Sequence, residues 1–332
     1  MAAPPGRPGS DPVSWIRRLT SLEPPGGVAP VVVVGNFDGV HRGHQALVQA
    51  ALEEAAQVGH GHPLPVVALT FDPHPARVVC PERAPASLMS LDEKARVLHD
   101  LGVSRLAVLP FSHDVSLWPA QVFARRVLQN ALGAAVVVVG RHFRFGHGRA
   151  GDVRLLESLG GELGFKVRAL DPVLHEGTAV SSTRVRQALA RGSVEGARAL
   201  LGRRFSVVGE VVHGDGRGRR LGIPTANLRI DGETVPGRGV YACWAGVAGR
   251  SQPAVVNIGC RPTFAGAEAS VEAHLLDFDA DLYGSSVSLE FEARLREEQA
   301  FPGPDALASQ IRQDIVDARG ILGLAPAAGP FG

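Results

Sequence analysis

Short apolar runs alternate with helix-like stretches in the first half of the chain. Residues 31–34 form a continuous valine run that ends at Gly35, which is typical of a buried strand in a parallel sheet. Apolar residues recur at helical spacing over 44–58. The same pattern predicts further strands at 66–71, 105–109, 135–139 and 166–170, and further helices at 91–101 and 119–132. This order predicts an α/β domain whose parallel sheet carries helices on both faces.

The second half of the chain follows a different pattern, in which short strands are broken by glycines. A helical stretch at 184–201 precedes it, and a final helix is expected at 305–322, with Leu307, Ile311, Ile315 and Val316 on one face. Strands are expected at 205–212, 240–245, 254–258, 271–278 and 287–295. This spacing predicts a small antiparallel barrel or sandwich.

The change of pattern near residue 200 divides the 332 residues into two domains, as the length also favours. We expect a disordered tail and lead-in at 1–27, an α/β domain at 28–192, a linker at 193–203, and a barrel domain with a C-terminal helix at 204–324. The first twelve residues are rich in proline and glycine and do not have the pattern of a signal peptide.

Composition places the chain among ordinary globular proteins, with 45% hydrophobic and 20% charged residues. A net charge of +1 argues against bulk attraction to nucleic acid or to a membrane surface, and no apolar run approaches the ~20 residues of a membrane span. Three widely spaced cysteines, Cys80, Cys243 and Cys260, are expected to be reduced core thiols. We therefore expect a cytoplasmic protein that binds neither nucleic acid nor membrane.

The basic residues are strongly biased in type. Of 34 in all, Lys94 and Lys166 are the two lysines, and the others are arginines. A GC-rich genome explains such a bias. Arginines that lie near phosphate-binding motifs still matter, because the planar guanidinium suits phosphate oxygens.

The segment from Gly35 to His44 combines features that suit a polyphosphate. It follows a predicted strand, at the sheet edge where such domains bind ligands, and leads into a helix whose free N–H groups attract anions. Gly39 and Gly43 allow the backbone to approach a ligand closely. His41 and His44 are three residues apart, so both imidazoles face one side of the first helical turn. Such a pair can donate hydrogen bonds to an α-phosphoryl group and to departing pyrophosphate.

Two other interpretations of the histidine pair are considered. The imidazoles could bind a metal ion, although no third ligand lies nearby in the sequence, or they could be incidental surface histidines. The succession of strand, glycine, loop and helix favours the phosphate interpretation. A second glycine-rich segment, 140–148, also follows a predicted strand and is the other candidate for ligand binding at this edge.

These motifs resemble those of a known family. The sequence HRGH at 41–44 resembles the signature of the nucleotidyltransferase superfamily, and GNFDGVHRGH at 35–44 resembles the prokaryotic bifunctional riboflavin kinase/FMN adenylyltransferases. TFDPHP at 70–75, FRFG at 143–146 and VSSTRVR at 180–186 also fit. The Ser-Ser-Thr run by itself can be a simple helix cap, but its hydroxyls, the free amides and Arg186 together form an anion site.

The resemblance implies a Rossmann-like nucleotidyltransferase domain with His41 and His44 as catalytic residues. It assigns ATP binding to Gly35, Asn36, Phe37, Asp38, Gly39, His41, His44, Ser181, Ser182, Thr183 and Arg186. It assigns flavin binding to Asp72, His74, His142, Phe143 and Phe145. The chain departs from the family at His142, where Asp or Asn is usual, and this difference concerns the flavin site rather than the ATP site.

A second candidate site is the segment HGDGRGRRLGIPTAN at 213–227. A glycine-rich loop can wrap phosphates with its backbone amides while arginines add charge, although such a run can also be a flexible solvated turn. It is not a Walker loop, because no Gly-Lys-Ser/Thr follows. The segment resembles the riboflavin kinase module. That resemblance assigns ATP and phosphate binding to Gly214, Gly216, Arg217, Gly218, Arg219, Gly222, Pro224, Thr225 and Asn227.

In that module Thr225 and Asn227 also help to bind Mg²⁺, an ion that hydroxyl and amide oxygens suit. Strand alternation places Glu272 and His274 on one face, which could be an ordinary solvated face. The resemblance instead assigns Glu272 as the general base for the riboflavin 5′-hydroxyl, a role in which a carboxylate takes a proton. The remaining flavin-binding assignments in this domain are Arg296 and Glu298.

The motifs imply an enzyme with two activities. The barrel domain is expected to phosphorylate riboflavin to FMN, and the α/β domain to adenylylate FMN to FAD with release of pyrophosphate. ATP is the expected co-substrate and Mg²⁺ the expected cofactor. Riboflavin, FMN, FAD and ATP are the expected binding partners, and the oligomeric state stays open. The alternatives are that one domain alone is active, or that the chain is a non-catalytic flavin or nucleotide sensor.

Overall fold

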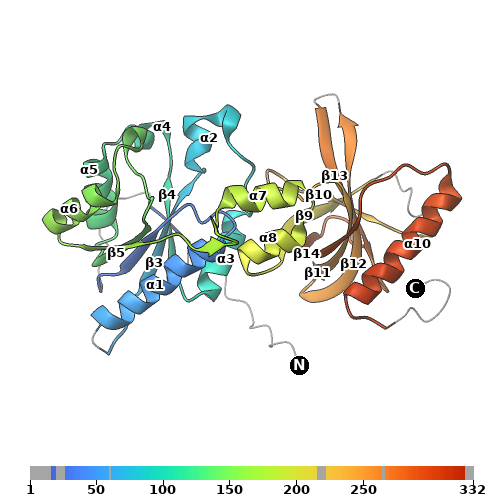
Figure 1. Ribbon diagram of the computed structural model, residues 1–332, viewed down its shortest axis with the longest axis horizontal. Helices are drawn as coiled ribbons and strands as arrows, with labels where there is room; N and C mark the ends of the chain where they lie inside the picture. Colours follow the sequence, from blue (N-terminus) through green and yellow to red (C-terminus); the bar gives the residue numbers. More distant parts are fainter. Residues whose placement is uncertain (1–15, 20–26, 60, 215–221, 264–265, 326–332) are drawn as a thin grey trace. The chain divides into compact units, whose positions relative to one another are not determined.

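The computed structural model describes residues 16–19, 27–59, 61–214, 222–263 and 266–325 (Figure 1). The chain forms two compact units, one of residues 1–85 with 90–180 and the other of residues 86–89 with 181–332. Each unit is described by itself. The segment Ser181–Arg186, which the sequence groups with the first site, belongs to the second unit.

The first unit is built on a parallel sheet in the order β1-β4-β3-β2-β5-β6. Every adjacent pair of strands in it is parallel, as the sequence predicts. Its strands are β1 (Ile16–Arg18), β2 (Val31–Val34), β3 (Val66–Asp72), β4 (Arg105–Pro110), β5 (Val136–Gly140) and β6 (Lys166–Leu170). The edge strand β1 was not predicted and falls within the stretch assigned to the tail and lead-in. Its three residues include two arginines, so no apolar run marks it.

Helices connect these strands. The first unit contains α1 (Arg42–Val58), α2 (Pro75–Val79), α3 (Leu91–Asp100), α4 (His113–Ser116), α5 (Ala120–Phe123) and α6 (Val153–Leu163). It also contains η2 (Pro81–Arg83), η3 (Ala124–Ala131), η4 (His147–Arg149) and the hairpin of β7 (Leu174–His175) and β8 (Thr178–Ala179). The single helix expected at 119–132 is wrong in detail, because η3 is a π-helix. The Leu132 N–H bonds the Val127 carbonyl at 3.0 Å, five residues back.

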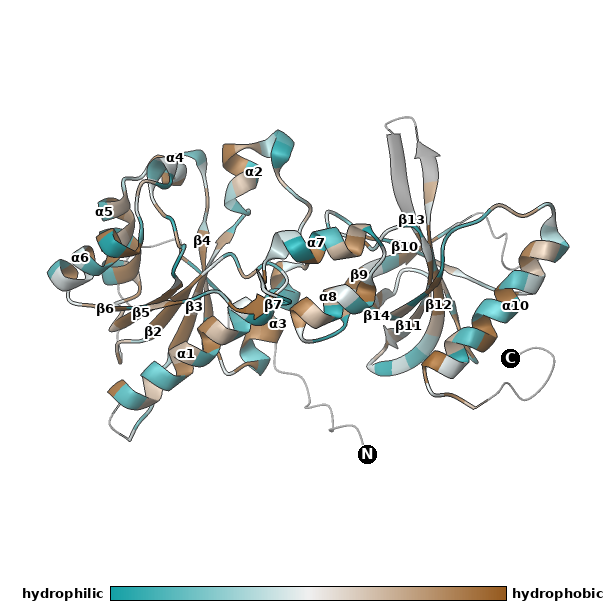
Figure 2. Ribbon diagram, viewed as in Figure 1, coloured by the Kyte–Doolittle hydropathy of each residue, from teal (hydrophilic) through white to brown (hydrophobic). Residues whose placement is uncertain are grey.

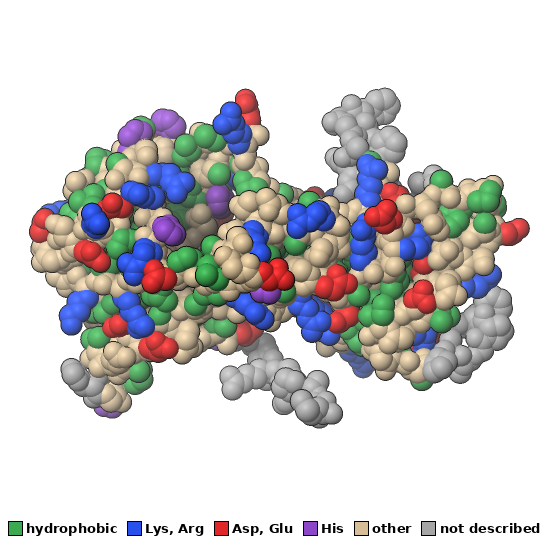
Figure 3. All heavy atoms as spheres, in the orientation of Figure 1, with side chains coloured by type: hydrophobic (Ala, Val, Ile, Leu, Met, Phe, Trp, Pro, Cys, Tyr) green, Lys and Arg blue, Asp and Glu red, His purple; other side chains and the backbone are tan. Residues whose placement is uncertain are grey.

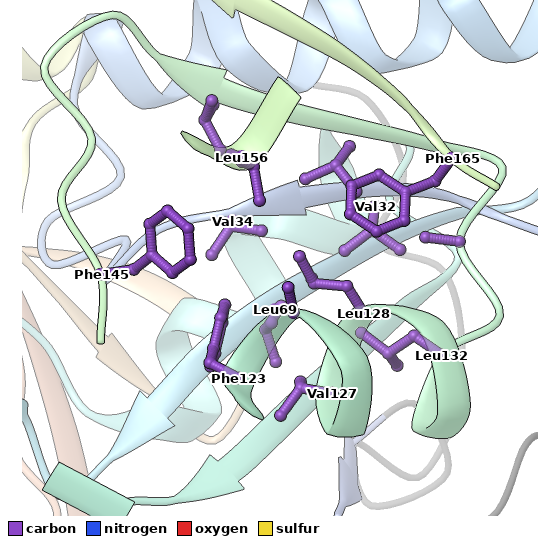
Figure 4. Close-up of a cluster of buried hydrophobic side chains, with 14 of the residues drawn as sticks. Val32, Val34, Leu69, Phe123, Val127, Leu128, Leu132, Phe145, Leu156 and Phe165 are labelled. Carbon is purple, nitrogen blue, oxygen red and sulfur yellow. The ribbon is translucent and has the colours of Figure 1, made fainter. Parts of the chain in front are cut away.

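Both faces of the sheet are covered by helices, as predicted. On one face Val32, Val34 and Leu69 pack with Phe123 and Leu128 (Figure 4). Helix α1 contacts β2, β3 and β5. Burial on both faces explains why these strands are continuous apolar runs, which appear brown in Figure 2. Helices therefore cover the faces of the sheet, and its loops are accessible at the ends of the strands.

The second unit is a closed antiparallel barrel preceded by two helices. The barrel order is β10-β13-β12-β11-β14-β9, and the ring closes between β10 and β9. Its strands are β9 (Phe205–Val212), β10 (Ala226–Arg229), β11 (Gly239–Val247), β12 (Arg250–Thr263), β13 (Gly266–Leu275) and β14 (Ser286–Arg296). The predicted barrel is confirmed, but the short strand β10 was missed, and β13 begins earlier and ends earlier than expected.

The predicted helical stretch 184–201 is two helices, α7 (Ser182–Ala190) and α8 (Val194–Leu201). They are separated at Gly192, which has a φ of 73°, in the left-handed region that favours glycine. Helix α8 occupies most of the segment 193–203 that the sequence assigns to a linker. The final helix, α10 (Pro304–Ile321), is close to its predicted bounds.

Helix α10 packs on the outer side of the barrel. Ile315 and Ala318 lie in a cluster with Val240, Ala242 and Val255. On the same helix the Asp314 carboxylate, only 2% exposed, accepts two hydrogen bonds of 2.8 Å from the guanidinium of Arg296 on β14 and one of 3.0 Å from Gln310 Nε2. A buried charge with this set of partners fixes α10 against the barrel.

The surface carries charges of both signs. Basic and acidic side chains are interspersed on the face drawn in Figure 3, in keeping with the small net charge. No helix in the described part of the chain is long and apolar enough to cross a membrane. The three cysteines are unpaired. Cys243 is a core thiol as expected, but Cys260 is only partly buried, and Cys80 is exposed at the end of the short helix α2.

We predict that Asp314→Ala lowers the free energy of unfolding of the barrel unit by about 3–5 kcal/mol, because it leaves the partly buried Arg296 charge without its partner. Asp317→Ala, on the exposed side of α10, is the matched control and should change it by less than about 0.5 kcal/mol. Denaturant unfolding measures both. Equal destabilisation by the two variants would contradict the anchoring role of the Asp314–Arg296 pair.

Candidate active sites

The loop between β2 and α1 has an unusual backbone. Phe37 and Val40 have positive φ angles of 48° and 39°, and Gly39 has 79°. A positive φ is costly for a β-branched residue such as valine, so the surroundings must hold this conformation. Burial supplies part of the restraint, since Phe37, Asp38 and Val40 are all buried. The loop is therefore a rigid element rather than a solvated turn.

Two side chains hold the loop at a single backbone atom. The carbonyl oxygen of Asn36 accepts a hydrogen bond of 3.1 Å from Thr70 Oγ1, on β3, and one of 2.9 Å from Lys94 Nζ, on α3. Both donors are buried. No role was predicted for Lys94, and its rarity as one of two lysines in the chain was the available signal.

The two histidines are arranged as their spacing predicts. His41 is the N-cap of α1, and its Nδ1 accepts a hydrogen bond of 3.3 Å from the backbone N–H of His44. The two rings stack with centroids 3.7 Å apart and planes at 14°. A side-chain carbon at Gly43 would lie 3.1 Å from Cε1 of His41, so glycine between the histidines allows the stack.

His44 is a neutral group in this environment. Burial lowers its pKa well below the ordinary value of 6.5, and its neighbours His41 and Lys94 lower it further. Its Nδ1 is buried without a hydrogen-bond partner among the described residues. The Phe37 ring, 5.2 Å away between centroids, packs beside it. A neutral imidazole in this position can donate one hydrogen bond to a ligand oxygen without carrying a permanent charge.

The predicted flavin residues of the first unit lie on several strand ends. Asp72, at the end of β3, pairs with Arg18 at 3.0 Å, and His74 caps α2 by accepting a hydrogen bond of 3.1 Å from Ala76 N–H. His142 is exposed after β5. Asp72 and His74 therefore have identified partners within the unit.

Aromatic rings form a connected row near the ends of β3 and β5. Phe143 and Phe145 stack with centroids 5.5 Å apart, Phe145 lies 5.7 Å from Phe123, and Phe123 lies 6.4 Å from Phe71. Phe71 and Phe123 were not among the predicted site residues. Such rings suit the flat faces of an aromatic ligand.

The predicted second phosphate motif begins α7 in the second unit. Ser181 is the N-cap, and its hydroxyl accepts a hydrogen bond of 3.3 Å from Arg184 N–H. Ser182 and Thr183 occupy the first turn. The Nε of Arg186 donates to the Ala86 carbonyl at 2.8 Å, which fixes the direction of this side chain.

In the barrel, three polar residues lie side by side on adjacent strands. Glu272 on β13 is directly opposite Asn227 on β10 and Asn257 on β12. Val271 and Ala273, which flank Glu272 on β13, are buried, so Glu272 faces away from the barrel interior. Cross-strand partners share one face of a sheet, so the three side chains form one polar row. Asn257 was not among the predicted site residues.

Glycines allow other predicted residues to approach this row. A side-chain carbon at Gly214 would lie 2.1 Å from Nδ2 of Asn227, so the amide packs against the start of the glycine-rich loop. A carbon at Gly259 would lie 2.9 Å from Oε1 of Glu298. Gly222 has a φ of 75°. The remaining predicted loop residues, Gly216, Arg217, Gly218 and Arg219, lie outside the described residues.

His274 supports the loop that carries Thr225. Its Nδ1 lies 2.7 Å from the Pro224 carbonyl, so that nitrogen carries the proton and donates. Burial lowers the pKa of His274. The neutral ring thus ties the turn before β10 to β13, which holds Thr225 beside the strand of Glu272.

Arg296, predicted to bind flavin, has its guanidinium in the bidentate pair with Asp314 and 5.6 Å from the centre of the Phe301 ring. Its planar group is therefore already oriented by the protein. Sequence analysis did not identify Asp314, because its burial depends on how α10 packs.

Comparison with known proteins matches both halves of the chain. The family model described as FAD synthetase matches residues 28–184, and the model described as riboflavin kinase matches residues 201–322. The "Bifunctional riboflavin kinase/FMN adenylyltransferase" of Escherichia coli K12 is 41% identical over 295 residues, covering 89% of this chain and 93% of the relative. Its namesake in Bacillus subtilis is 34% identical over 295 residues, covering 87% and 91%.

Among solved structures, a crystal structure described as a macrolide-efflux protein from Streptococcus pneumoniae has a TM-score of 0.83 and 32% sequence identity. The match covers 92% of this chain and 99% of the chain in that structure. The fold of this chain is thus shared over nearly the whole length of that protein.

The two family models identify the chain as a nucleotidyltransferase domain followed by a flavin kinase domain. Both halves are domains of enzymes that use ATP. The chain belongs to the family of bacterial bifunctional riboflavin kinase/FMN adenylyltransferases.

We predict that His44 makes the stability of the protein depend on pH. As the pH falls below about 6.5, His44 of the unfolded chain takes up a proton, whereas the folded site with its lowered pKa does not. The free energy of unfolding therefore falls with pH in this range. His44→Gln should abolish this part of the fall in denaturant unfolding at pH 5.5 and 7.5.

The matched control is His62→Gln, which replaces an exposed histidine and should leave the pH dependence as in the wild type. If His44→Gln and the wild type lose equal stability between the two pH values, the lowered pKa of His44 in the folded protein is contradicted.

Proposed function

We propose that the barrel phosphorylates riboflavin to FMN with ATP, and that the α/β unit then joins FMN to AMP from a second ATP, giving FAD and pyrophosphate. Residues 28–192 would form the adenylyltransferase domain and 204–324 the kinase domain, joined by 193–203. The observation that carries the proposal is that one chain holds both a stacked histidine pair at a helix start and a carboxylate in a polar barrel row. ATP is the co-substrate of both reactions, so we place the enzyme in the cytoplasm.

In the adenylyl step, an FMN phosphate oxygen attacks the α-phosphorus of ATP. The bond between that phosphorus and the oxygen leading to the β-phosphorus breaks, and pyrophosphate leaves with the electron pair. His41 and His44 would donate hydrogen bonds to oxygens on which negative charge grows. No proton has to be removed from the attacking phosphate oxygen, which suits a site whose partly buried His44 has a lowered pKa. Positioning and charge stabilisation therefore supply the catalysis.

The remaining groups of the first site would bind the substrates. The positive end of the helix dipole at the start of α1 would attract phosphate. In the second unit, Ser182, Thr183 and Arg186 would also bind phosphate, because the start of α7 and a guanidinium together attract anions. At the ends of the aromatic row, Phe71 and Phe143 are only partly buried and would offer ring faces to the isoalloxazine.

In the kinase step, the riboflavin 5′-hydroxyl attacks the γ-phosphorus of ATP, and ADP leaves. Glu272 would take the hydroxyl proton as the new oxygen–phosphorus bond forms. The row places Glu272 between Asn227 and Asn257, so a flavin hydroxyl near the carboxylate would also lie near amide donors. The Asp314 pair and the Phe301 contact would hold Arg296 oriented for the flavin.

A magnesium ion fits the kinase site by the chemistry of the donors. Thr225 offers a hydroxyl oxygen and Asn227 an amide oxygen, both hard neutral ligands of the kind Mg²⁺ accepts. No group of three or more His, Cys, Asp or Glu side chains in the described part of the chain could hold a metal alone. Phosphates and waters would therefore complete the coordination. The ion, when bound, would neutralise charge on the phosphates.

The two activities should separate by mutation. His44→Ala should slow FMN adenylylation about 10²–10³-fold, because a hydrogen-bond donor to the growing charge is lost, and should leave riboflavin phosphorylation unchanged. Glu272→Gln should slow riboflavin phosphorylation about 10²–10⁴-fold and spare FMN adenylylation. Chromatography of FMN and FAD made from riboflavin or from FMN with Mg-ATP measures both. Each variant is the other's control, and equal loss of both steps in both variants would contradict two separate sites.

Thr225→Val should raise the Mg²⁺ concentration needed for half-maximal riboflavin phosphorylation at least about tenfold, because a methyl group replaces the ligand hydroxyl. Thr225→Ser, which keeps the hydroxyl, should stay close to the wild type. FMN adenylylation by the same proteins should keep its Mg²⁺ dependence. An unchanged Mg²⁺ requirement in Thr225→Val would remove Thr225 from the metal site.

A further inference from the structure

Lys94 is a buried cation at the edge of the first site. It lies in the first turns of α3, whose N-cap Ser90 accepts a hydrogen bond from Glu93 N–H. Its exposure is only 9%, which is rare for a lysine. Burial lowers its pKa, although the carboxylates of Asp38 and Asp72 act to raise it. Keeping this charge inside the protein is costly, so a compensating role is expected.

The type of residue at this position is informative. Nearly every other basic residue in the chain is arginine, yet this buried position is a lysine. The ammonium is compact and can direct a hydrogen bond from the end of a thin stem, whereas a guanidinium is a broad planar fork. A single backbone oxygen in a closed space, such as the Asn36 carbonyl, suits the ammonium.

The contacts of Lys94 connect it to the histidines in three short steps. Nζ donates to the Asn36 carbonyl at 2.9 Å. The next residue, Phe37, has the positive φ of 48°, and its ring packs 5.2 Å from the ring of His44. His44 in turn stacks on His41 at 3.7 Å. Moving the Asn36 carbonyl would therefore move the surface against which His44 is held.

Gly35 allows the ring of Phe37 to pack closely against the end of β2. A side-chain carbon there would lie 3.2 Å from Cζ of Phe37, so the ring folds back over the end of β2 without free space. A packed interior transmits a shift of the backbone to the rings rather than absorbing it. The loop has two anchors at one oxygen, Lys94 and Thr70, and both come from outside the loop.

We propose that Lys94 is a positioning residue for adenylyl transfer: together with Thr70 it fixes the Asn36 carbonyl and so sets the geometry of the stacked pair His41 and His44. This rests on the proposed role of the histidines in the adenylyl step. Lys94 acts through Asn36 and Phe37, and its effect is on the orientation of the imidazoles toward the substrate.

Lys94→Met tests this in the full-length protein with FMN and Mg-ATP. Methionine keeps the length of the side chain and removes the donor and the charge. The kcat for FAD formation should fall about 10²-fold, because small displacements of catalytic groups cost this much, while the KM for FMN changes little. Riboflavin phosphorylation by the same molecules should stay at the wild-type rate. Lys166→Met, at the exposed other lysine, should behave as the wild type.

A double-mutant cycle gives the sharper readout. Thr70→Val removes the other donor to the same oxygen, and Thr70→Ser keeps it. Because both donors act on one atom, the double variant Lys94→Met/Thr70→Val should lose much less than the product of the two single losses. Losses that multiply would show that the two residues act independently, and would overturn the proposal.

The outcomes also separate this inference from the proposed function. If the wild type makes no FAD, the adenylyltransferase assignment fails. If the wild type makes FAD and Lys94→Met makes it at the same rate, only the positioning role fails. Should Lys94→Met not fold, Thr70→Val decides: about tenfold slower FAD formation with recovery in Thr70→Ser supports the role, and a wild-type rate in Thr70→Val overturns it.

Discussion

The first site depends on how one backbone carbonyl, that of Asn36, is held. The chain must turn there from a buried strand into a helix, and a buried carbonyl needs a hydrogen-bond partner. Thr70 and Lys94 provide two. With the carbonyl fixed, the positive φ of Phe37 is tolerated, the phenyl ring packs on His44, and the helix begins with its imidazoles stacked. Backbone strain is thus located where the histidines must be rigid.

The second site achieves rigidity by another means. Asn227, Glu272 and Asn257 are placed by the hydrogen-bond register of adjacent barrel strands, so their spacing is set by the ladder itself. His274 then ties the turn before β10 to β13. In both sites the polar groups are carried on or held against regular elements, which suits chemistry that relies on positioning.

Much of the fold could be predicted because its signals are local. The valine run of β2 and the helical spacing of α1 predicted their bounds closely, and the three-residue spacing predicted that His41 and His44 share a face. Strand β10 was missed because its four residues contain no apolar run. Lys94 and Asp314 could not be predicted, since their burial arises from the packing of α3 and α10 against distant segments.

One chain is expected to move two different parts of ATP at two sites. The most direct measurement supplies riboflavin with ATP labelled separately at the α- and γ-phosphorus and follows the labels into FMN and FAD. The γ-label should appear in the phosphate of FMN, and the α-label only in the AMP half of FAD, with pyrophosphate formed in a 1:1 ratio to FAD. The α-label in FMN, or FAD formed without an equal amount of pyrophosphate, would contradict the account.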